Sequence, residues 1–120
     1  MSGKPNPTAL ADKLISLTNE GKLDWNEDPN DNDAPWVKVG DLFIVLREGR
    51  NAHGANLFRI SLETDSEEVI DSFTDEELDA ETSTDYYFKQ LDLLFSKARR
   101  AASGADKALL QVLKGLDDLG

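Results

Sequence analysis

The sequence predicts an α+β fold: a three- or four-stranded antiparallel β-meander packed by an N-terminal helix and a long C-terminal helix. Apolar residues recur at helical spacing within residues 10–17 and again within residues 88–116. Between these stretches, residues 35–62 hold short apolar runs separated by turn residues, which is typical of a meander. The 120 residues contain no internal repeat or linker, so we expect a single domain over residues 1–120, with residues 1–6 as a flexible start.

The first helix is expected over about residues 7–20. Asn6-Pro7 has the form of an N-cap followed by proline in the first helical turn. Gly21 is placed to end the helix in the left-handed conformation. The buried stripe of this helix is predicted to consist of Leu10, Leu14 and Leu17.

The strands of the meander follow a polar loop that we expect over residues 26–33. Gly40-Asp41 predicts a two-residue hairpin between the first two strands. The third strand alternates, so Phe58, Ile60 and Leu62 should face the core while Arg59 and Ser61 face outward. The expected strands are 35–39, 42–46, 57–62 and, more weakly marked, 68–71.

Residues 42–46 are apolar on both faces, which favours a central strand with both sides at least partly covered. Trp36, Phe43 and Val45 are candidates for a groove lining on the second face of the sheet. Apolar side chains of a sheet usually pack under a helix, so we expect these three residues to be core.

A short helix over about residues 75–81 has the clearest local signal in the chain. Thr74 and Glu77 have the spacing of a capping box, and Phe73 and Leu78 occupy the positions of a hydrophobic staple.

The apolar rhythm of residues 88–116 continues without a phase change across Ser103-Gly104. We therefore predict one helix from Asp85 to about Leu116, roughly 48 Å long at ~1.5 Å per residue. The alternative is a break at Gly104, with Ser103 as the cap of a second helix that folds back as a hairpin. A continuous helix would extend beyond its own domain, so a homodimer is expected, with self-association through Leu109, Val112, Leu113 and Leu116.

The formal net charge of −11 is concentrated in one part of the chain. Between Arg59 and Lys89 there are 11 acidic and no basic residues, while the remaining 13 acidic residues balance the 13 basic ones. This charge repels nucleic acid and anionic membranes and attracts basic proteins. We expect an acidic face that binds a basic partner and consists of Glu67, Glu68, Asp71, Asp75, Glu76, Asp79 and Glu81.

Motifs for metal or catalytic chemistry are weak. Asp28, Asn30 and Asn32 match the start of a calcium loop, but Asp33 and Val39 stand where the required glycine and bidentate glutamate should be. His53, the single histidine, lies in a glycine-flanked loop without a recognisable nucleophile or phosphate-binding motif. We therefore expect no metal site, no cofactor and no catalytic residue.

The sequence is best interpreted as a non-enzymatic, acidic protein-interaction module, of the inhibitor, immunity or nucleic-acid-mimic type. Two alternatives stay open: a small enzyme or ligand-binding domain that uses the His53 loop and the region of Trp36 and Trp25, and an adaptor whose long helix makes the contact. The absence of cysteine, of a signal-peptide pattern and of a membrane span predicts a cytoplasmic protein.

Overall fold

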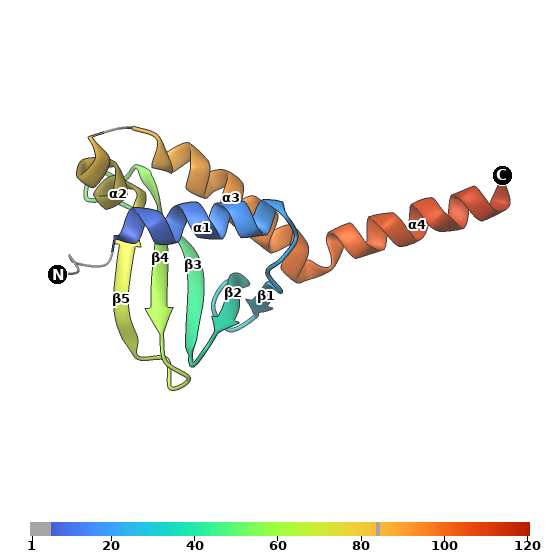
Figure 1. The fold of residues 1–120 in the computed structure, drawn as a ribbon, viewed down its shortest axis with the longest axis horizontal. Coiled ribbons are helices and arrows are strands. Elements are labelled where there is room, and N and C mark those ends of the chain that lie inside the picture. The colour runs from blue at the N-terminus through green and yellow to red at the C-terminus, as the bar shows by residue number, and fades with distance from the viewer. Residues whose placement is uncertain (1–5, 84) are drawn as a thin grey trace.

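A computed structural model describes residues 6–83 and 85–120 and confirms the α+β class (Figure 1). All strand pairings are antiparallel, in the sequential order β1-β2-β3-β4-β5. The elements are α1 (Pro7–Asn19), β1 (Asn26–Asp28), β2 (Ala34–Val39), β3 (Leu42–Arg50), β4 (Asn56–Glu63), β5 (Val69–Thr74), α2 (Asp75–Thr82), α3 (Tyr87–Ser103) and α4 (Ala105–Leu119).

Within the described residues the meander has five strands, where three or four were expected. The predicted loop over residues 26–33 contains the short edge strand β1, in which Asn26 pairs with Trp36. The weakly marked fourth strand exists as β5 and extends to Thr74. Gly40 has a φ of 62° in the two-residue hairpin between β2 and β3, as its position predicted.

Helix α1 begins and ends where the capping residues indicate. The Asn6 side chain accepts a hydrogen bond from the Thr8 N–H, and Gly21 has a φ of 71° after the last turn. Asn6 is therefore an ordered cap rather than part of a flexible start. The rest of that prediction, residues 1–5, lies outside the described residues.

The core lies between one face of the sheet and helices α1, α2 and α3. Phe58 and Ile60 point into it from β4, with Leu62 partly buried beside them, as the alternation predicted. The Phe58 ring lies 5.5 Å from the ring of Phe88 and 5.6 Å from that of Phe95, centroid to centroid, so β4 is joined to α3 through aromatic contacts.

The capping box at the start of α2 is present as predicted. The Glu77 N–H donates to Thr74 Oγ1, and the Thr74 N–H donates to Glu77 Oε1. Leu78 is fully buried in the core, and Phe73 packs against the same cluster. These contacts attach α2 to the end of the sheet.

The prediction of one continuous C-terminal helix is wrong. Gly104 has a φ of 76°, a left-handed conformation that ends α3 and starts α4 in a new direction. The fold-back alternative is also wrong, since α4 projects away from the body and the molecule extends over 58 × 33 × 31 Å (Figure 1). Ser103 caps nothing in α4, because its hydroxyl donates to the Arg100 carbonyl oxygen.

Candidate functional site

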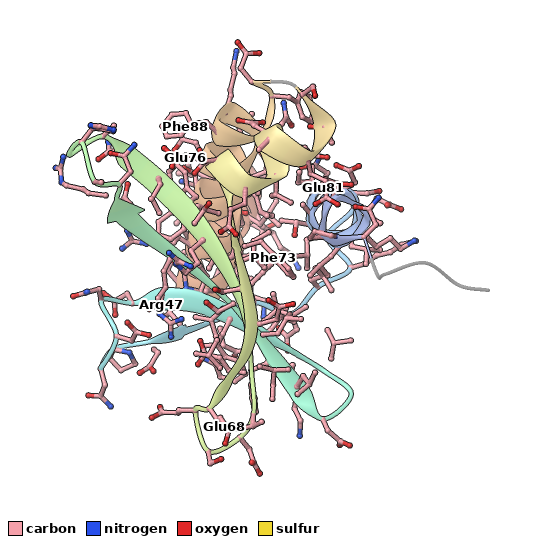
Figure 2. The ribbon with its side chains drawn as sticks, turned by 90° about the vertical axis from the view of Figure 1, so that its left-hand side faces the viewer. Arg47, Glu68, Phe73, Glu76, Glu81 and Phe88 are labelled. Atoms are coloured by element: carbon pink, nitrogen blue, oxygen red, sulfur yellow. The ribbon has the colours of Figure 1, made fainter. Side chains whose placement is uncertain are left out.

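The seven acidic residues predicted to form one face are not together. Glu67 and Glu68 lie at the turn between β4 and β5, whereas Glu76 and Glu81 lie on α2, which follows the other end of β5. A six-residue strand separates these ends by roughly 20 Å at ~3.3 Å per residue. Figure 2 shows Glu68 at one end of the body and Glu76 with Glu81 at the other.

Two of the seven carboxylates, Asp75 and Asp79, accept hydrogen bonds from backbone N–H groups of other elements. Asp75 is 3% exposed, and its Oδ1 accepts a hydrogen bond of 2.8 Å from the Phe58 N–H. Asp79 Oδ1 accepts a hydrogen bond of 2.8 Å from the Tyr87 N–H and so caps the first turn of α3. The predicted acidic face is therefore corrected: Asp75 is buried, and Asp79 serves a helix terminus.

Asp75 gives a test of this structural role. Asp75→Ala is expected to lower the free energy of unfolding by about 1–3 kcal/mol, because the buried Phe58 N–H loses its acceptor. Asp75→Asn keeps an oxygen for that bond and should retain most of the stability. Urea unfolding of both variants, monitored by circular dichroism, measures the difference. Equal losses for alanine and asparagine would contradict the assigned hydrogen bond.

The same residue predicts a pH dependence. Burial raises the pKa of Asp75 above its ordinary value of 3.8, although the hydrogen bond from Phe58 acts in the opposite direction. The protonated form is thus favoured in the folded state. Its stabilising contribution is present below pH 3.8 and is lost as pH rises through the raised pKa. Stability of Asp75→Asn relative to wild type should therefore increase with pH over that interval.

His53 lies exposed in the loop between β3 and β4. The backbone N–H groups of His53 and Ala55 both donate to Asn51 Oδ1, so the Asn51 side chain closes the loop. A ligand-binding or catalytic role for this loop required an enclosed polar pocket around His53. The structure places the residue at an open loop tip, which removes the support for that alternative.

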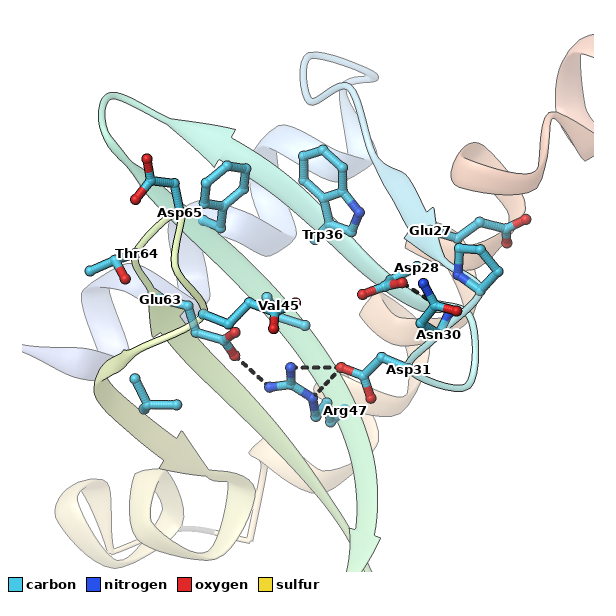
Figure 3. A pocket seen from close by; sticks show the side chains of 14 residues that line it. Glu27, Asp28, Asn30, Asp31, Trp36, Val45, Arg47, Glu63, Thr64 and Asp65 are labelled. Carbon is cyan, nitrogen blue, oxygen red and sulfur yellow. Dashed lines mark hydrogen bonds and ion pairs between the residues drawn. The ribbon is translucent and has the colours of Figure 1, made fainter.

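A hollow of about 740 Å³ lies on the sheet face opposite the main core (Figure 3). Trp36, Phe43 and Val45 from β2 and β3 form its apolar floor. One wall is the turn after β1, and the other is the hairpin between β4 and β5. Its acidic lining residues are Glu27, Asp28, Asp31, Glu63, Asp65 and Glu67.

Among the described residues that line the hollow, Arg47 on β3 is the only basic one. Its Nη1 lies 2.6 Å from Glu63 Oε2, and its Nη2 and Nε lie 2.7 Å and 2.9 Å from Asp31 Oδ2. Burial acts to lower the pKa of Arg47, but hydrogen bonds to Glu63 and Asp31 outweigh it and raise the pKa above the ordinary value. Arg47 therefore stays charged. It connects β3 to the turn after β1 through Asp31 and to the end of β4 through Glu63.

The second face of the sheet is covered differently from the prediction. Trp36 and Phe43 are only partly buried and line the hollow, which is the interpretation that the sequence favoured less. Val45 also lines the hollow, but it is only 7% exposed and so is buried as expected. Ser61 is only 2% exposed on this face, rather than outward in solvent, because it lies between Val45 and Ser72. The sequence signal that could have revealed the hollow is the alternation along β3 and β4. It places Arg47 and Glu63 on the same face of the sheet as Val45 and Ser61.

The turn that contains Asp28, Asn30 and Asn32 does not have the form of a calcium-binding loop. The Asn30 N–H donates to Asp28 Oδ1, so this carboxylate stabilises its own turn. Among the residues that the structure describes, no group of three or more histidine, aspartate or glutamate side chains could hold a metal ion.

Helix α4 carries the second candidate surface. All of α4 is described, and none of its residues is buried. The four residues predicted for self-association lie on one side of the helix together with Ala105 and Leu119. We call this set the α4 stripe: Ala105, Leu109, Val112, Leu113, Leu116 and Leu119. Each of its five large members exposes about half or more of its surface. The opposite side consists of Lys107, Gln111, Lys114 and Asp118.

Comparison of the chain with protein-family models, with curated proteins and with solved structures found no significant match. Within residues 6–83 and 85–120, none of the helices has the length and apolar character needed to cross a membrane.

Proposed function

We propose that this chain is a cytoplasmic, non-enzymatic protein-interaction module that works as a homodimer joined through α4. The observation that carries the proposal is the α4 stripe, an apolar helix face with no partner inside the described chain. Scattered exposed apolar residues are normal on a protein surface, but a contiguous apolar face usually marks an interface.

The energetics of α4 support a partner. An isolated helix of 15 residues is marginal in water, and Gly115 in its interior weakens it further by about 1 kcal/mol relative to alanine. Burial of one leucine side chain contributes about 1.5–3 kcal/mol. A second helix packed on the α4 stripe would thus stabilise α4 and remove its leucines from water together.

The charge distribution favours a second copy as that partner. The chain carries −11, but α4 holds two lysines against three aspartates, so it adds only −1 of that charge. Two copies therefore repel each other least along α4. In an antiparallel pair, the two acidic bodies would lie at opposite ends of the helix pair, which keeps their repulsion low.

Neighbouring residues on α4 offer a matched test. Val112→Glu puts a charge into the α4 stripe, while Gln111→Glu adds the same charge on the polar side one residue away. Wild type and Gln111→Glu are expected to have twice the 13.3 kDa chain mass in light scattering after size exclusion. Val112→Glu should weaken dimerisation by about 100-fold or more, because an unpaired charge in an apolar interface is strongly unfavourable.

Circular dichroism supplies an independent readout. Helix content of the wild type should rise with protein concentration as α4 pairs, and that of Val112→Glu should not. A wild type that stays monomeric up to about 100 μM, well above ordinary dimer dissociation constants, would overturn the homodimer. A dimer that survives Val112→Glu would show that α4 is not the interface.

The acidic composition supports a further contact with a basic protein, as an inhibitor or immunity-type module would make. The acidic residues at the two ends of β5 form two groups roughly 20 Å apart rather than one cluster. The hollow gathers six carboxylates on one face and is the better candidate surface for such a contact.

A further inference from the structure

We propose that the hollow binds an extended segment of a basic protein, with arginine or lysine side chains of that segment seated over Trp36 and between its acidic walls. The inference deepens the proposed interaction function but uses a surface separate from α4. It can therefore fail or succeed independently of dimerisation.

The charge of the hollow selects a cationic occupant. Arg47 is paired with Asp31 and Glu63, which leaves four lining carboxylates: Glu27, Asp28, Asp65 and Glu67. None of these four takes part in an ion pair within the described parts of the chain. Their uncompensated charge attracts cations and repels phosphate-bearing ligands such as nucleic acid.

The aromatic floor adds a specific place for a cation. The rings of Trp36 and Phe43 are in an edge-to-face arrangement with centroids 5.3 Å apart. Lys38 Nζ already lies 5.8 Å from the centroid of Phe43, so this side of the sheet accommodates a cation over an aromatic ring. Trp36 is only partly buried and offers the larger ring to a side chain from outside.

The placement of the carboxylates favours a peptide segment over a single small cation. Glu27 and Asp28 lie on one side of the hollow and Asp65 lies on the other, with Trp36 between them (Figure 3). Two basic side chains of one extended segment can thus reach both walls at once. A volume of about 740 Å³ is sufficient for side chains of this size.

A fluorescein-labelled hexa-arginine peptide is a suitable probe, with its binding to the full-length protein followed by fluorescence anisotropy. Glu27→Gln/Asp65→Asn removes one carboxylate from each wall, and both residues are exposed. Glu76→Gln/Glu81→Gln removes the same charge from α2 and serves as the matched control. The first variant should weaken binding by about tenfold, and the control by less than about twofold, since nearby charge pairs dominate over remote ones.

Trp36→Leu tests the aromatic contribution. It keeps every carboxylate and should weaken hexa-arginine binding by about threefold, because the guanidinium loses its aromatic partner. Binding of wild type should also fall as salt is raised from about 0.05 to 0.5 M, where the Debye length shortens. Repeating the titration with monomeric Val112→Glu is expected to give the same affinity per chain as wild type.

The outcomes separate the possibilities. Equal loss in both charge variants would show that net charge alone attracts the peptide and would overturn the site. A larger loss in Glu76→Gln/Glu81→Gln would move the contact to α2, and absence of binding would exclude a basic segment. Loss of binding in Val112→Glu would make the hollow dependent on the dimer and would overturn its independence.

Discussion

Phe58→Ala is expected to lower the free energy of unfolding by about 3–5 kcal/mol. The side chain is 5% exposed and contacts the rings of Phe88 and Phe95 on α3. Its removal leaves a cavity between β4 and α3 and eliminates both aromatic contacts. Because a domain of this kind is stabilised by about 5–15 kcal/mol in total, the variant should be close to unfolding.

Phe58→Leu is the matched variant, since it keeps an apolar side chain of similar reach. We expect it to lose about 1–2 kcal/mol, consistent with a partly filled cavity. Guanidinium unfolding followed by near-ultraviolet circular dichroism measures both. Similar small losses for alanine and leucine would mean that Phe58 does not join the sheet to α3.

Arg47→Met is expected to lower the free energy of unfolding by about 2–3 kcal/mol. Glu63 has a side chain only 7% exposed and would lose its cationic partner. The expected loss is smaller than for a fully buried pair because the Arg47 side chain is 33% exposed. The change also releases Asp31, and with it the link between the turn after β1 and the sheet.

The double variant Arg47→Met/Glu63→Gln separates charge from packing. It removes the unpaired carboxylate and should recover at least half of the lost stability, in which case the two substitutions are strongly coupled. Chemical unfolding of the two single variants and the double variant completes the cycle. Additive losses would indicate that the ion pair contributes little and that Arg47 acts through its aliphatic stem.

The interpretation as an interaction module thus combines two surfaces with different physics. The α4 stripe is apolar, and its association should tolerate salt. The hollow is acidic, and binding there should be weakened by salt. Parallel measurements at low and high ionic strength would distinguish the two contacts without any substitution.

Features controlled by near neighbours could be predicted from the sequence. The cap at Asn6, the hairpin at Gly40 and the capping box of Thr74 each depend on backbone groups within four residues. The inward side of β4 followed from simple alternation, as Phe58 and Ile60 show. Only β1 was missed among the strands, since its three polar residues resemble a loop.

Features controlled by distance could not be predicted. Acidic residues that are close in sequence, such as Glu68 and Glu76, are separated by the length of β5. Conversely, Asp31 and Glu63 are 32 residues apart in sequence but share Arg47. The hollow exists because strand register brings these residues to one face, and a pattern along the chain contains no register.

Helices α3 and α4 show most clearly the contrast between features that depend on near neighbours and features that depend on distant contacts. Their sequence alone specified helical residues with a continuous apolar side, and both α3 and α4 are helices with that side. The direction of α4 in space depends on one backbone angle at Gly104, which glycine adopts on either side of zero at little cost. Tertiary structure therefore determined that Leu91 and Ala98 on this side of α3 are buried in the core, whereas the α4 stripe stays exposed.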